Sequence, residues 1–137
     1  MSNDTDNLAR IQEQAGLQRP IRHQLFIGGK FVDAANGATL ASVNPHDGST
    51  IVEVAMAGKE DVDRAVAAAQ AALPVWSRMS ASDRGRILLR LADKIEANLE
   101  DLARLESLDT GHPLRDSRLI DVPRTVLCFR YFGGIAD

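Results

Sequence analysis

Hydrophobic positions in the first third of the chain alternate over short runs that are separated by turn residues. Residues 25–32 read LFI-GG-KFV, which predicts a strand, a two-residue glycine turn and a second strand. Further strands are predicted at residues 39–43 and 51–54, with a proline-led turn between them. We therefore expect this part of the chain to form a small antiparallel β-meander.

From residue 59 onward, apolar residues recur every three or four positions, a spacing typical of amphipathic helices. We expect a helix to begin near Lys59 and to end at Pro74, which leaves Trp76 buried as an anchor in the following linker. The expected buried face of this helix consists of four small or aliphatic residues, Val62, Val66, Ala69 and Leu73.

Capping residues divide the remainder of the chain into further helices. Ser80, followed three residues later by Asp83, is typical of a helix start. The apolar stripe after it is broken near Asn98, so two helices are expected before the stop signal at Gly111. A last helix, running to about residue 133, is predicted to be capped by Asp121.

The order of these elements predicts an α/β fold, in which a short antiparallel meander is followed by three or four amphipathic helices. Residues 1–22 are polar and without strong periodicity, so we interpret them as a flexible arm with about one helical turn near residues 8–14. The predicted strands are few, and no later strand is predicted that would return to the sheet and extend it. Such an arrangement is typical of one layer of a larger domain. Residues 23–137 are therefore expected to be an incomplete domain.

Composition narrows the possible partners. The chain has 45% hydrophobic residues, 26% charged residues and a net charge of -3, and the absence of a basic stripe argues against nucleic acid. No run approaches the roughly 18 apolar residues of a membrane span. The single cysteine, Cys128, precludes an internal disulfide framework and fits a reducing compartment, so we expect a cytoplasmic protein.

Four segments follow one another along the chain: the hairpin LFIGGKFVDAANG at residues 25–37, the turn SVNPHDG at 42–48, the helical stretch at 60–114, and FRYFGGIAD at 129–137. In their order and spacing they resemble the first hairpin, the NPxxG turn, the two long helices and the end of the third helix in the N-terminal region of the aldehyde dehydrogenase superfamily. Any one of them is a weak signal, but the ordered set is specific. The resemblance extends over about residues 25–137.

This resemblance implies the N-terminal part of a coenzyme-binding domain, ahead of its Rossmann-like strands. It also implies that the complete protein oxidises an aldehyde to a carboxylic acid with NAD or NADP, and that it is a homo-oligomer. In the family, a cysteine thiolate attacks the aldehyde, hydride passes to the nicotinamide, and a glutamate activates water. The family places these groups further along the chain, and no glycine-rich phosphate loop occurs here.

We therefore expect no catalytic and no cofactor-binding residue in this chain, no bound cofactor for the chain alone, and no dehydrogenase activity from it. The main alternative is a non-catalytic helical interaction module or a remnant of the family. In that case the exposed apolar helix faces would recruit a partner. The sequence does not identify the aldehyde or distinguish NAD from NADP.

Asp109 follows an apolar stripe at a predicted helix end, where the helix dipole disfavours an acid. One interpretation is a solvated Asp that bonds nearby backbone groups. The family resemblance implies another, in which Asp109 and the backbone carbonyls of Ser42 and Val43 surround a monovalent cation in the complete protein.

Other reactive side chains carry weaker signals. Cys128 lies in an apolar helical run and is interpreted as a small buried hydrophobe. His112, in a segment where the family most often has lysine, is interpreted as a surface residue without metal-ligand neighbours. Arg130 and Tyr131 are expected to pack and to form a structural ion pair. By the resemblance, Arg124 falls near the side of the third helix that faces the substrate tunnel.

Overall fold

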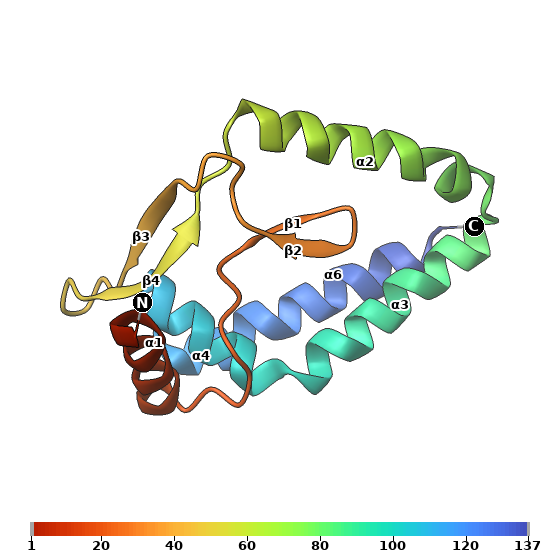
Figure 1. Cartoon of the computed structure of the whole chain (residues 1–137). Coiled ribbons are helices and arrows are strands. Elements are labelled where there is room, and N and C mark those ends of the chain that lie inside the picture. Colours follow the sequence, from red (N-terminus) through yellow and green to blue (C-terminus); the bar gives the residue numbers. More distant parts are fainter. Residues whose placement is uncertain (1, 137) are drawn as a thin grey trace.

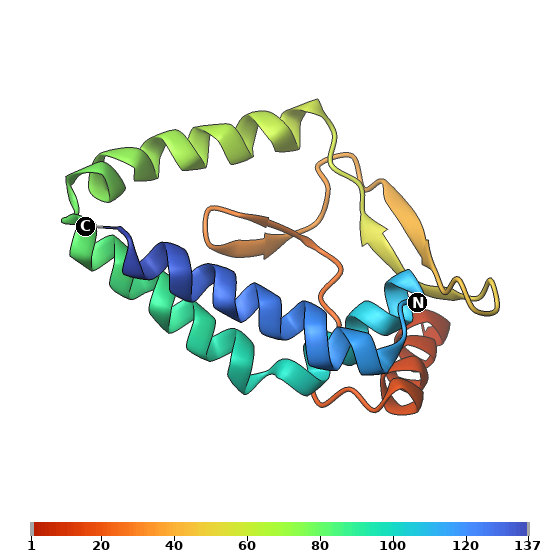
Figure 2. The same ribbon diagram turned by 180° about the vertical axis from the view of Figure 1, so that it is seen from behind.

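The computed structural model describes residues 2–136, and side chains from residue 8 onward. It has the predicted α/β class, with short antiparallel strand pairs ahead of most of the helices. Figure 1 shows three regions: a long helix at one side, a layer of helices at the other, and a β-hairpin between them. Figure 2 gives the same arrangement from behind.

The strands form two separate hairpins. β1 (Leu25–Ile27) pairs with β2 (Lys30–Val32) across Gly28 and Gly29, whose φ angles of 60° and 80° confirm the predicted glycine turn. β3 (Thr39–Val43) pairs with β4 (Thr50–Ala55). Strands β2 and β3 do not pair, so the predicted antiparallel strands form two separate hairpins.

A buried carboxylate explains why the chain turns away after β2. Asp61 is 1% exposed and accepts hydrogen bonds from the backbone N–H of Ala35, at 3.1 and 3.2 Å, and of Gly58, at 3.0 Å. These bonds fix the loop between the hairpins against the start of the next helix. Arg64 lies 3.3 Å from the same carboxylate, which limits the cost of burying its charge.

Helix α1 (Ser2–Ala15) is longer than the single turn expected in the N-terminal arm. It lies against β4 and the helix that contains Asp101 and Arg104. The side-chain carboxylate of Asp101 accepts from the backbone N–H of Gln18 at 2.9 Å. The domain boundary near residue 22 and the flexibility of the arm stay predictions.

Helix α2 (Lys59–Arg78) begins where expected but continues through Pro74, which contradicts the predicted end. Proline removes one backbone N–H donor and does not prevent the following turn from staying helical. Trp76 therefore lies in the helix and is 43% exposed, so its predicted burial is also wrong. The face predicted to be buried is open to solvent, because Val62, Val66 and Leu73 are each more than half exposed.

The next helix boundaries follow the predicted capping signals. α3 (Ala81–Ala97) is capped by Ser80, whose hydroxyl accepts from the Asp83 N–H at 3.0 Å. Asn98 separates it from α4 (Leu99–Thr110), as predicted. α4 ends at Gly111, which has the left-handed φ of 74° that glycine adopts without strain.

The last helix is part of a longer helical run and has no separate start at Asp121. α5 (Leu114–Asp116) leads into η1 (Ser117–Asp121), a π-helical turn, and then into α6 (Val122–Gly134). Asp121 has helical angles and its side chain makes no capping bond. The predicted cap is therefore wrong, and its carboxylate is directed elsewhere.

The core of the described residues lies between α3, α4 and α6. Ala92 and Ala103 are fully buried, Val122 and Val126 are nearly so, and β4 adds the buried side chain of Ile51. Arg130 on α6 pairs with Asp93 and Glu96 on α3, at 3.2 and 2.6 Å, which confirms the expected structural ion pair. Tyr131 is 63% exposed, and its ring packs edge-on against the ring of Phe132, with 5.3 Å between the ring centroids. No described helix is long and apolar enough to cross a bilayer.

Two glycines allow α3 and α6 to approach closely. A Cβ placed on Gly85 would lie 2.5 Å from the carbonyl oxygen of Gly133, and a Cβ on Gly133 would lie 3.1 Å from the carbonyl oxygen of Gly85. Both distances are shorter than ordinary van der Waals contact, and both involve backbone oxygen atoms, which cannot move aside as a flexible side chain can. The absence of side chains at these positions therefore determines the spacing between the helices.

We predict that Gly85→Ala destabilises the chain by about 1–3 kcal/mol, although alanine has the higher helix propensity. The added methyl group would force α6 away from α3. Gly134→Ala is the matched control, because nothing lies within 4 Å of its added Cβ. Urea unfolding followed by circular dichroism measures both variants. Equal or greater stability of Gly85→Ala would contradict the packing argument.

Candidate functional site

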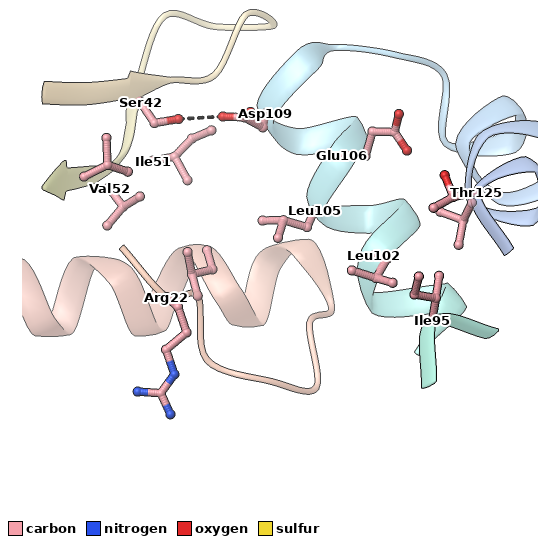
Figure 3. Close-up of a pocket in the computed structure, with 13 residues that line it drawn as sticks. Arg22, Ser42, Ile51, Val52, Ile95, Leu102, Leu105, Glu106, Asp109 and Thr125 are labelled. Carbon is pink, nitrogen blue, oxygen red and sulfur yellow. Dashed lines mark hydrogen bonds between the residues drawn. The ribbon is translucent and has the colours of Figure 1, made fainter. Parts of the chain in front are cut away.

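The candidate site is a hollow between the β3–β4 hairpin, α4 and α6. It encloses about 590 Å³ and has a mainly apolar lining to which Ile51, Leu102 and Val122 contribute. Five polar side chains also line it, those of Arg22, Ser42, Glu106, Asp109 and Thr125. Figure 3 shows these groups around the hollow, with the two acids on the same stretch of α4.

The structure brings together two of the residues that the sequence predicted at a cation site. The Ser42 hydroxyl of β3 donates to Oδ1 of Asp109, at the end of α4, over 2.6 Å (Figure 3). Val43 is the next residue of the strand, and its side chain is 47% exposed. The register of β3 changes between Ser42 and Val43, an irregularity of the β-bulge kind that bends a strand locally.

A hydroxyl donor from a distant strand offsets the unfavourable position of Asp109 at a helix end. Asp109 lies in the last turn of α4, which contains no basic residue to compensate its charge. Because the carboxyl end of a helix carries partial negative charge, an acid there is favoured only with a donor or cation nearby. The Ser42 hydroxyl provides that donor from a strand 67 residues away in sequence.

The structure places Cys128 on an exposed part of α6, so its predicted burial is wrong. The apolar run that suggested burial is real, but α3 covers a different side of the helix, on which Val126 is buried. Arg124 is exposed on the same helix. Its position beside a substrate tunnel stays a prediction.

His112 is on the surface, as predicted, but it does have carboxylate neighbours. Its Nδ1 lies 2.7 Å from Oδ2 of Asp121, and both groups lie near Glu106. The cluster is not visible as a sequence motif, because the acids lie six residues before and nine residues after the histidine. Only the turn at Gly111 and the π-helical segment bring the three together.

Comparison with known proteins identifies the family. The sequence pattern of the Aldehyde dehydrogenase family matches residues 31–137. The chain is 49% identical over 118 residues to the mitochondrial aldehyde dehydrogenase of Rattus norvegicus, covering 84% of this chain and 23% of that protein. The chain therefore belongs to the aldehyde dehydrogenase family, as the sequence resemblance indicated.

Solved structures agree with this assignment. The crystal structure of PnpE from Pseudomonas sp. WBC-3 matches with a TM-score of 0.83 and 60% identity, over 84% of this chain and 24% of that one. PnpE in complex with nicotinamide adenine dinucleotide matches with a TM-score of 0.84 and 61% identity, over 85% and 24%. The fold is that of the N-terminal coenzyme-binding region of the family, and this chain spans about a quarter of these relatives.

Proposed function

We propose that this chain is the N-terminal segment of an NAD(P)-dependent aldehyde dehydrogenase that oxidises an aldehyde to a carboxylic acid. The observation that carries the proposal is the match of nearly the whole described fold to PnpE at 61% identity, including its complex with NAD. The substrate of the complete protein is an aldehyde, and NAD is the cofactor favoured by this likeness. NADP remains the alternative cofactor.

The 137 residues alone are proposed to be inactive. The only thiol, Cys128, lies on the surface of α6 and does not line the hollow. No glycine-rich turn joins a strand to a helix in this sequence, so the chain has no phosphate-binding loop of the kind that grips a dinucleotide. We expect residues outside this sequence to supply the nucleophile, the general base and the cofactor-binding groups.

We predict that the purified chain produces no NADH or NADPH above background when it is mixed with aldehyde and either cofactor. A complete aldehyde dehydrogenase assayed in parallel is the positive control. Aldehyde-dependent turnover by the chain, retained in Cys128→Ser, would show that the catalytic machinery has been assigned to the wrong place. Turnover that Cys128→Ser abolishes would instead identify Cys128 as the nucleophile and equally refute the proposal.

The mass of the native protein tests whether this chain is a segment of a complete dehydrogenase. We expect a cytoplasmic, homo-oligomeric product several times heavier than 14.9 kDa, because the matched relatives are about four times as long as the matched segment. Mass spectrometry of the cytoplasmic fraction, after native size separation, measures these properties together. A product of 14.9 kDa would contradict the dehydrogenase assignment.

The second candidate function is a helical interaction module, favoured by the exposed apolar surface. Trp76 and a row of aliphatic side chains on α2 are open to solvent, and so are Leu127 and Phe132 on α6. A monomer that melts cooperatively and does not self-associate would support an independent module. Dye binding with self-association would support a segment whose apolar faces are covered by the rest of a larger protein.

We also propose that, in the complete protein, Ser42, Val43 and Asp109 surround a monovalent cation. The supporting observations are the 2.6 Å contact between Ser42 and Asp109 and the supply of hard oxygen atoms from a carboxylate, a hydroxyl and strand carbonyls. The charge of Asp109 at a helix carboxyl end favours a cation at the same place.

We predict that K⁺ or Na⁺ raises the melting temperature of the complete protein above its value in a bulky organic cation at equal ionic strength. Asp109→Asn is expected to remove most of this difference, because it removes the charge and keeps the shape. Asp47→Asn is the matched control on the exposed turn after β3. An unchanged cation response in Asp109→Asn would contradict the site.

A further inference from the structure

The loop after α4 gathers three side chains with metal-ligating atoms from three separate elements. Glu106 comes from α4, His112 from the loop, and Asp121 from the π-helical turn before α6. Among the described residues, they are the group whose ligand atoms all lie within 4.8 Å of one another. One imidazole and two carboxylates form a mixed nitrogen and oxygen donor set.

Hydrogen bonds to both the N–H and the carbonyl group of His112 hold the loop backbone in place. The backbone carbonyl of His112 accepts from the Ser107 hydroxyl at 2.7 Å, and its backbone N–H donates to Oγ1 of Thr110 at 3.2 Å. Gly111 closes the helix just before it. The imidazole is therefore held close to its present position by the backbone, with Nδ1 turned toward Asp121.

The pairing around Asp121 is incomplete. Its Oδ2 is buried and lies 2.7 Å from His112 Nδ1, yet it has no well-directed hydrogen bond. The fully buried Ser117 adds only a long contact, with its hydroxyl 3.5 Å from the same ring nitrogen. Because this buried oxygen has a close contact with His112 but no hydrogen bond, it is placed to accept a cation that lies between the three groups.

From this geometry we propose that Glu106, His112 and Asp121 bind a divalent transition-metal ion, with Zn²⁺ as the probe ion. Imidazole favours zinc, cobalt, nickel or copper over magnesium and calcium. In a tetrahedral zinc site, each metal–ligand bond is about 2.0–2.2 Å long, which places neighbouring ligand atoms roughly 3.3 Å from each other. The present distances are close enough for small side-chain rotations to reach that geometry, with water as the fourth ligand.

Such an ion would join α4 to the segment that begins α6. The proposal uses residues of this chain only and does not depend on the proposed dehydrogenase function. It is also distinct from the monovalent cation site, because it uses Glu106 and an imidazole, whereas that site uses Asp109, a hydroxyl and strand carbonyls. Imidazole is a poor ligand for the alkali cations, so the two sites are expected to differ in ion preference.

Titration calorimetry of the 137-residue chain with ZnCl₂, without an affinity tag that contains histidine, tests the site. We expect one bound ion per chain, and a loss of affinity on the order of tenfold or more in His112→Lys, Glu106→Gln and Asp121→Asn. His46→Ala is the matched control, an exposed turn histidine that should leave the affinity unchanged. Excess Mg²⁺ should not compete.

A second measurement covers variants that fail to fold. Co²⁺ added to the unaltered chain should give visible absorption bands, and its paramagnetism should shift the ring signals of His112 more than those of His23 or His46. No Zn²⁺ binding at millimolar concentration would overturn the proposal. Unchanged affinity in a folded His112→Lys variant, or paramagnetic shifts centred on another histidine, would overturn it equally.

Discussion

The close contact between α3 and α6 sets the arrangement of the helical layer. Gly85 and Gly133 let the two backbones meet where any side chain would separate them. That contact determines where α6 runs, and so where Val122 and Val126 pack against the neighbouring helices. The ion pairs of Arg130 lie at the solvent-exposed edge, where such pairs contribute about 0–1 kcal/mol, so backbone and apolar packing set the arrangement.

Helix boundaries were predictable because they depend on local chemistry. Ser80 and Gly111 act within one turn of their own positions, through a hydroxyl that accepts from backbone N–H and a left-handed φ. The predicted helix end at Pro74 is wrong because proline removes one hydrogen bond, and the remaining bonds still hold the helix together. The π-helical turn before Asp121 has no comparable local signal, so the sequence suggested a new helix start there.

The burial of side chains on the helices was predicted less well than the helix boundaries, because it depends on which other elements pack against each helix face. The periodicity of α2 marks its apolar face correctly, but no described residue covers Val66 or Leu73 there. Burying such a side chain fully is worth about 1.5–3 kcal/mol. Cys128 shows the same limitation on α6, where α3 covers only one side. Amphipathic spacing identifies the side of a helix that packs, and distant partners decide whether it is buried.

Electrostatics at the carboxyl end of α4 connect the two proposed ion sites. Glu106 and Asp109 lie one turn apart at the negative end of a helix whose last turn has no basic residue. Ser42 donates to one acid, and His112 pairs with Asp121 beside the other. The spacing of the acids was readable from the sequence, whereas their partners from β3 and the π-helical turn were not. Negative charge concentrated there is balanced best by bound cations, and the donor chemistry of each acid's neighbours determines which cation each site accepts.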